Sequence, residues 1–385
     1  MTDGGGGVPG AGTGSVIRHA AALSVILPGL AQILAGRRAS GGFALWVWVG
    51  CLSILVLRWD VVLDAPLGPL DHRVAFVTLF AGLLGAWAWS FRALRRTPRS
   101  PQAEVTGPWW PVAESFSRSR LAVLGLVIVG TAYLVALLVP FIAPYEPGIT
   151  AGFGSEGMLR PSLAHPFGTD RLARDVFTMV LYGARISLSI GLIAVAISVT
   201  IGTVLGAVSG YLGGWSDSVI MRVVDVVIAF PRLVLLIAVV ALFNSSLLLI
   251  ILVLGLTQWP TTTRLVRGEV LSLRERDFVQ AARALGYSRA RIIFRHIVPN
   301  VLAPVIVAAT LGIGDMIVLE AGLSYLGLGV QGDVPSWGAM VADGQSNMLN
   351  AWWISTFAGL AIVFTVLSFN LVGDGLRDAL DPHIE

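Results

Sequence analysis

Lysine is missing from this sequence. All 26 basic residues are arginine. A Walker A phosphate loop needs a lysine beside its final serine or threonine, so the chain cannot bind a nucleotide through such a loop. Schiff-base chemistry on a lysine amine is excluded as well. If this protein works with ATP, hydrolysis through a Walker A site must take place on another chain.

Cysteine and charge are both scarce. The single cysteine, Cys51, lies within an apolar run, so no intrachain disulfide is possible. Charged residues make up 13% of the chain, against about a quarter in soluble domains. Hydrophobic residues make up 55%, and the mean hydropathy is +0.80. This composition indicates an integral membrane protein.

The apolar segments are long and continuous, whereas a membrane β-barrel would show short alternating segments. The sequence therefore predicts an all-α polytopic membrane protein. Six spans are expected in its larger C-terminal part, near 121–143, 183–209, 219–243, 247–263, 301–323 and 351–373. Two to three extra membrane helices are expected before them, in runs near 19–35, 41–58 and 74–94; the first run is interrupted at Pro28-Gly29 and could instead be re-entrant or interfacial.

Composition divides the chain into four parts. Residues 1–15 are glycine-rich and expected to be disordered, and 16–95 form an extra N-terminal block of membrane helices. Residues 96–120 are expected to form a cytosolic linker with an interfacial helix near its tryptophan pair. Residues 121–385 form the main membrane domain. No convincing secretory signal is present at the N-terminus.

The most polar stretch of the main domain, residues 264–300, is rich in arginine and helix-forming residues. The positive-inside rule places it in the cytosol. Asp277 is predicted to cap a short helix, with Gln280 completing a capping box. Gly286 would allow a turn with positive φ, and Ala281 and Ala282 would allow close helix contact. The alternative is a solvated connecting helix whose arginines only fix topology.

The segment from Gln280 to Gly286, followed by Val298-Pro299, resembles the Glu-Ala-Ala loop of binding-protein-dependent ABC importer permeases, in particular the second permease subunits of the dipeptide, oligopeptide and nickel type. Gln280 replaces the glutamate of that motif. Three further stretches support the resemblance, which covers about 116–385: His165-Pro-Phe-Gly-Thr-Asp170 with its continuation, Leu319 to Gly329 with Pro335-Ser-Trp-Gly338, and Leu367 to Pro382.

The resemblance implies a type I importer permease core that forms half of a translocation pore and has no catalysis of its own. Its expected partners are a second homologous permease, two cytosolic ATPase subunits that bind ATP and Mg, and an extracytoplasmic solute-binding protein. Membrane lipid surrounds it, and nucleic acid is not a partner. The expected location is the bacterial plasma (inner) membrane. Di- or oligopeptides are the expected cargo, with nickel chelates or oligosaccharides as alternatives.

The same resemblance assigns residues to the ATPase contact: Asp277, Phe278, Gln280, Ala281, Ala282, Arg283, Gly286, Tyr287 and Pro299. It also implies an external loop that faces the binding protein, including His165, Gly168, Asp170 and Trp337. One histidine and one carboxylate make only a weak metal site, so none is expected.

Charges within predicted spans are further candidates. Asp315 could line a pathway or pair with an arginine, while Glu320 is a pathway candidate for which helix packing is favoured. A proton-coupled secondary transporter using these two carboxylates is one rival function. A membrane anchor or assembly protein, suggested by the N-terminal block, is another. Arg222 and Asp225 stand three residues apart, where a local ion pair is expected.

Overall fold

The computed structural model describes residue 28 and residues 38–95, 110–147, 157–243, 245–330 and 335–380. In these ranges the chain is helical as predicted; no strand is present, only an isolated bridge between Thr169 and Asp175. The expected disordered segment 1–15, the apolar run 19–35 except for Pro28, and linker residues 96–109 lie outside the described residues. Contacts divide the chain into two compact units: 1–108 with 137–142, and 109–136 with 143–385.

The first unit is a small helical assembly. Its described elements are α3 (Arg38–Leu57), α4 (Trp59–Asp64), the short 3-10 helix η1 (Ala65–Leu67) and α5 (Leu70–Arg95), with the last residues of α7. Helices α3 and α5 pack together and contain the predicted runs 41–58 and 74–94. Cys51 is fully buried, and a side chain at Gly82 would meet its sulfur at 3.0 Å. The ring of His72 meets that of Phe141 edge-on.

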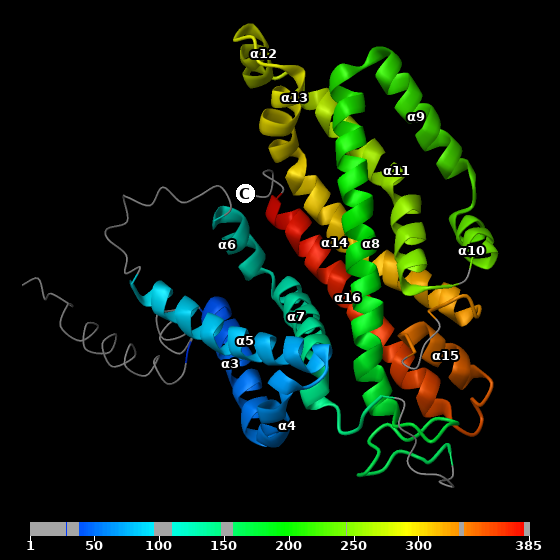
Figure 1. Cartoon of the computed structure of the whole chain (residues 1–385). Coiled ribbons are helices and arrows are strands. Elements are labelled where there is room, and N and C mark those ends of the chain that lie inside the picture. Colours follow the sequence, from blue (N-terminus) through cyan, green and yellow to red (C-terminus); the bar gives the residue numbers. More distant parts are fainter. Residues whose placement is uncertain are drawn as a thin grey trace, which may run out of the picture. The chain divides into compact units, whose positions relative to one another are not determined.

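The second unit holds the remaining helices (Figure 1). They are α6 (Trp110–Arg118), α7 (Arg120–Ile142), α8 (Val176–Leu212), α9 (Gly214–Ala229), α10 (Arg232–Leu242), α11 (Leu247–Leu273), α12 (Asp277–Ala284), α13 (Arg289–Ile292), the π-helix η2 (Ile293–Ile297), α14 (Val298–Tyr325), α15 (Trp337–Gln345) and α16 (Trp352–Leu380). Helices α8, α14 and α16 pack on one another. The α12–α13 loop lies at one end of this unit, and α15 lies at the other (Figure 1).

Five helices of the described chain are long and apolar enough to cross a membrane: α7, α8, α11, α14 with the preceding 289–297 segment, and α16. The remaining predicted span, 219–243, was expected to be one continuous helix, and that prediction is wrong. It is broken into α9 and α10, which meet at 82°. Pro231 explains the break, because it lacks an N–H and forces Phe230 into an extended conformation (φ −85°, ψ 130°).

Two other boundaries differ from prediction. Helix α8 starts at Val176, several residues before the expected 183, because the carboxylate of Asp175 accepts a hydrogen bond from the Thr178 N–H and caps it there. The stretch between the expected spans 301–323 and 351–373 contains the helix α15, which is capped in the same way by Ser336.

Helices α8 and α11 approach each other closely along a row of glycines. A methyl group at Gly202 would meet Thr262 Cβ at 2.5 Å, and one at Gly206 would meet the Thr263 carbonyl oxygen at 2.7 Å. Gly210 faces Val270 in the same way. Small residues of this spacing allow backbone-to-backbone packing between membrane helices. This close contact holds α8 and α11 together.

Buried apolar residues of the second unit form two clusters. The larger, here called the main core, draws on α8, α10, α11, α14, α15 and α16 and includes Trp337, Trp353 and Phe369. The smaller, here called the loop core, lies where the arginine-rich loop joins the bundle. It consists of Ala207, Tyr211, Val266, Val270, Val279, Ala282, Ile292, Ile293, Ile297, Val301 and Val305.

Candidate functional site

The arginine-rich segment folds as a short helix, α12, between two turns. Asp277 is its first residue and not its cap, because Arg276 takes the extended N-cap conformation (φ −71°, ψ 148°) and no side chain caps the helix. The predicted capping box with Gln280 is therefore wrong. Asp277 in the first turn still places a negative charge at the positive end of the helix dipole.

Gly286 ends α12 as predicted, with φ +75°. The Tyr287 N–H donates to the Ala282 carbonyl at 3.2 Å, and the Gly286 N–H donates to the Arg283 carbonyl at 2.9 Å. These two bonds form a Schellman motif, which requires a left-handed residue at the Gly286 position. The motif reverses the chain and sends it back towards α14.

The two faces of α12 differ in what they contact. Val279 and Ala282 are buried in the loop core, so Ala282 allows close packing of α12 on its own chain. Phe278, Ala281 and Leu285 are exposed and lie three and four residues apart, on one helix face. Phe278 is 40% exposed and Leu285 72% exposed. The helix thus offers an apolar surface of small and large side chains to a second protein.

Arg283 and Tyr287 are held within the chain. The Arg283 Nε donates to the Tyr211 hydroxyl at 3.3 Å, and its guanidinium lies 5.0 Å from the centre of that ring. Tyr287 stacks on His296, with Arg291 over the Tyr287 ring at 5.3 Å. These contacts position α12 against the end of α8 and the π-helix. Of the predicted contact residues, Pro299 lies in the first turn of α14, and Gln280 is exposed.

Two ion pairs join α9 to α11. Asp217 accepts two bonds from Arg267, Nε to Oδ1 at 2.6 Å and Nη2 to Oδ2 at 2.7 Å, and one from the Ser209 hydroxyl. Asp225 pairs with Arg264 of α11 at 2.6 Å. The predicted Arg222–Asp225 pair is therefore wrong, because Arg264, 39 positions away in sequence, is the partner that the fold brings to Asp225.

At the opposite end of the unit, the expected binding-protein loop folds on its own polar groups. His165 Nδ1 lies 3.0 Å from Asp175 Oδ1, next to the α8 cap. Asp170 accepts from the backbone N–H groups of Leu172 and Arg174 and from the Arg174 Nε at 2.7 Å. Residues 165–175 of this loop are therefore held together by their own polar groups.

The remaining loop candidates pack inside. Gly168 has φ +74°, and a side chain there would meet the Leu159 carbonyl oxygen at 2.6 Å. Trp337 is buried and donates from Nε1 to the Val180 carbonyl at 2.9 Å. Leu159, Leu163 and Leu172 are large apolar side chains that this loop exposes. Gly168 and Trp337 thus pack beneath this loop and are not part of its exposed surface.

The two carboxylates predicted as pathway candidates lie in different surroundings. Glu320 is fully buried and accepts from Ser324 at 2.6 Å and from Ser187 of α8 at 3.3 Å. Ser336, the α15 cap, donates to Ser324 at 3.1 Å. Glu320 therefore joins α8, α14 and α15 from within. Asp315 is exposed on α14.

A charged residue in the broken span was missed. Arg232 is the first residue of α10, directly after Pro231, and its Nη2 lies 3.2 Å from the sulfur of Met316 on α14. Its charge interacts with that of Asp315. An arginine inside an apolar run and next to a proline was the signal that could have identified it.

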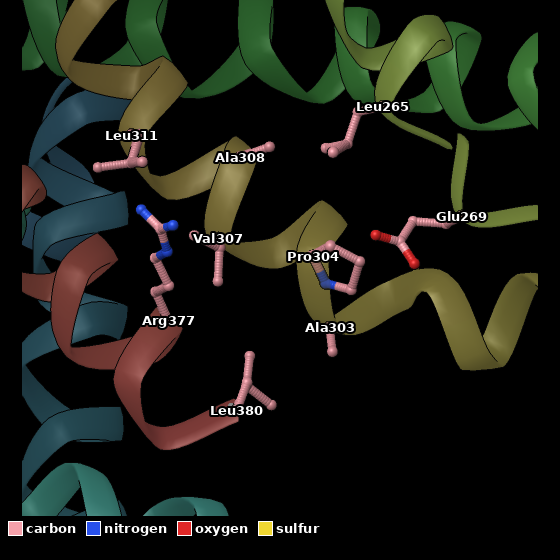
Figure 2. Close-up of a pocket in the computed structure, with 9 residues that line it drawn as sticks. All are labelled: Leu265, Glu269, Ala303, Pro304, Val307, Ala308, Leu311, Arg377 and Leu380. Atoms are coloured by element: carbon pink, nitrogen blue, oxygen red, sulfur yellow. The ribbon is translucent and has the colours of Figure 1, made fainter. Parts of the chain in front are cut away.

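An open groove of about 620 Å³ lies near the loop core, between α11, α14 and α16. Figure 2 shows Glu269 and Arg377 on opposite sides of the apolar side chains that α14 contributes. That volume lies within the range of small-molecule sites. In the described parts of the chain, no group of three or more histidine, cysteine or carboxylate side chains could hold a metal ion.

Comparison with known families gives two matches in series. Residues 107–154 match the N-terminal TM domain of oligopeptide transport permease C, and residues 202–385 match the binding-protein-dependent transport system inner membrane component. The second match contains three of the four sequence motifs, and the motif that begins at His165 lies between the two matches. Residues 1–106 lie outside both.

The chain matches individual relatives over almost their full length. The chain is 42% identical over 292 residues to the dipeptide transport system permease protein DppC of Alkalihalophilus pseudofirmus, covering 75% of this chain and 95% of that protein. It is also 42% identical to the glutathione transport system permease protein GsiD of Escherichia coli O157:H7, covering 76% and 96%. A chain of the MetNI methionine ABC transporter matches with a TM-score of 0.45 at 17% identity, over 53% of this chain and 97% of that one.

The sequence relationships decide the class. This chain belongs to the family of binding-protein-dependent transport system inner membrane components, the permeases of ABC importers. The predicted resemblance to dipeptide-, oligopeptide- and nickel-type permeases is confirmed, and so is the all-α polytopic fold. The protein is a multi-pass membrane protein.

Proposed function

We propose that this chain is one of two homologous permease subunits of an ATP-driven importer of di- or oligopeptides in the bacterial inner membrane. The peptide cargo is supported by relatives named for dipeptide and glutathione transport, glutathione being a tripeptide. ATP and Mg²⁺ bind to two cytosolic ATPase subunits, and a solute-binding protein delivers the cargo from outside. Residues 16–95 form a membrane module in addition to the 121–385 core.

The observation that carries the coupling role is the two-faced helix α12. Its inner face, Val279 and Ala282, is fixed in the loop core, while Phe278, Ala281 and Leu285 remain exposed. An exposed apolar face on a short, rigidly held helix matches the grooves that bind amphipathic helices. We assign the outer face of α12 as the surface that contacts an ATPase subunit.

Coupling then follows from linkage. The ATPase dimer shifts the permease between conformations only to the extent that it binds the two conformations differently. Because α12 is joined to α11 on one side and to α14 on the other, a displacement of the helix acts on both spans.

The test is a bulky substitution on the outer face, Ala281→Trp. Purification with co-expressed ATPase subunits should recover at least tenfold less ATPase per permease, and ATP-dependent peptide uptake should fall equally. The control is Ala164→Trp, an exposed alanine in the loop at the opposite end of the unit, which should retain the ATPase. Equal thermal unfolding of both variants would show that folding is intact.

Full ATP-dependent uptake in the Ala281→Trp variant would refute the assignment. Uptake that survives removal of the ATPase subunits but collapses with the proton gradient would support the rival secondary transporter. Deleting residues 1–100 tests the N-terminal module: loss of assembly of an otherwise folded core would support an assembly role, and unchanged transport would show that it is dispensable.

A further inference from the structure

Arg232 and Asp315 form a charged site within the membrane that the family assignment does not explain. Arg232 follows Pro231 at the 82° break between α9 and α10, and Asp315 lies on α14, next to the Met316 that Arg232 contacts. Helices α10 and α14 pack on each other. Residues 83 positions apart in the sequence are thus brought to one place in the span region.

Arg232 is poorly satisfied by its own chain. Its Nε is buried and has no hydrogen-bond partner, and its Nη2 meets only the weak sulfur acceptor of Met316 at 3.2 Å. No ion pair within 4.0 Å is found for Arg232 among the described residues. A guanidinium carries five donors and binds carboxylates in bidentate fashion, so this arginine retains most of its capacity for an anion.

Asp315 is exposed on the surface of the isolated chain, without an ion pair of its own among the described residues. A charged side chain within a membrane helix is costly when it faces lipid. Intramembrane carboxylates therefore face an aqueous pathway or another subunit. Arg232 contacts Met316, the direct neighbour of Asp315 in sequence, so the two charges lie close together where α10 packs on α14.

The break between α9 and α10 also favours binding of an anion near Arg232. α10 begins at Arg232, and its first chain-internal helical bond runs from the Leu235 N–H to the Pro231 carbonyl. The N–H groups of the first turn thus have no helical acceptor. Broken membrane helices present such N-termini to the anionic groups of their substrates.

We propose that Arg232 binds the terminal carboxylate of a peptide in the translocation pathway and that Asp315 receives its terminal ammonium group. The proposal rests on the peptide importer function proposed above and adds the part of the substrate that this subunit recognises. A cation and an anion that lie close together without forming an ion pair match a zwitterion. The class of ligand is therefore a short peptide with both ends free.

The experiment measures binding directly, on the assembled importer in nanodiscs without its solute-binding protein. Labelled dialanine is the probe, competed with unlabelled dialanine, with its C-terminal amide and with its N-acetyl derivative. We expect the wild type to prefer dialanine to the amide at least tenfold, the effect of one charge-assisted bidentate bond. Arg232→Gln should abolish that preference, and Asp315→Asn should abolish the preference over N-acetyl-dialanine.

Arg222→Gln is the matched control, because Arg222 is an exposed arginine on the other arm of the same broken span. It should leave both preferences unchanged. Absence of dialanine binding or of any preference in the wild type would overturn the proposal, as would a preference that survives Arg232→Gln.

ATP-driven uptake by the same wild-type importer, with its binding protein restored, separates the two proposals. Normal uptake combined with failed discrimination rejects only the terminal-carboxylate site. Failure of ATP-driven peptide uptake itself rejects the proposed function.

Discussion

The main core and the loop core differ in where their polar groups lie and in what those groups bind. In the main core, Glu320 is satisfied by serines inside the bundle, and the indole N–H of Trp337 reaches a backbone carbonyl. Around the loop core, the polar groups lie on the rim, as in the Asp217–Arg267 pair. The difference follows from the solvent. Lipid offers no hydrogen bonds, so Glu320 and Trp337 depend on partners within the chain, whereas water shares the task near the loop.

The largest expected effect tests the main core. Glu320→Ala should destabilise the protein by about 3 kcal/mol, because it leaves a cavity and deprives Ser324 and Ser187 of their acceptor. Glu320→Gln keeps an acceptor and should cost less than half as much. Thermal unfolding in detergent, followed by tryptophan fluorescence, measures both. Equal effects of the two substitutions would show that the serine network contributes little.

An intermediate effect is expected where the α8–α11 contact meets the loop core. Gly206→Ala should destabilise the protein by about 2 kcal/mol, because the new methyl group would meet the Thr263 carbonyl at 2.7 Å. Gly268→Ala on α11 is the control, since no atom lies within 4 Å of its added methyl group. That variant should be neutral or slightly stabilised, as expected for glycine replaced by alanine in a helix. A neutral Gly206→Ala would mean that the two helices separate easily.

The smallest effect is expected for the two ion pairs between α9 and α11. Asp217→Asn should cost about 1 kcal/mol, because the bidentate pair with Arg267 is only 22% and 30% exposed. Asp225→Asn should cost less than about 0.5 kcal/mol, since its pair with Arg264 is 59% and 49% exposed. Adding salt should weaken the Asp225 pair more. If Asp225→Asn proved the more harmful variant, burial would not be what sets the strength of these pairs.

Much of this fold could be predicted from hydropathy, because a membrane span needs about 20 apolar residues in a row. The Gly286 turn was also readable, because a Schellman motif has a strong residue preference. The break at Pro231 was missed because an apolar window does not register a proline that ends one helix and begins another. Local chemistry at Phe230-Pro231 would have revealed it.

The candidate site was harder to predict, because its details are set by contacts distant in sequence. Arg222 looked like the natural partner of Asp225, but the fold supplies Arg264 instead. Ala282 and Ala281 are neighbours with the same side chain, yet one is buried and the other exposed. Their difference depends on which face of α12 meets the loop core, and no local pattern encodes that choice.

Helix α14 has a mechanical consequence. It starts in the loop core with Val301 and Val305 and continues unbroken past Asp315 to Glu320. Its 28 residues correspond to a rod of roughly 42 Å at 1.5 Å per residue. A rod anchored at one end in the loop core and at the other to α8 and α15 transmits a push along its axis, and Pro304 is the position inside it where a bend could form. Force applied at α12 would therefore reach the contacts with α8 and α15 as displacement.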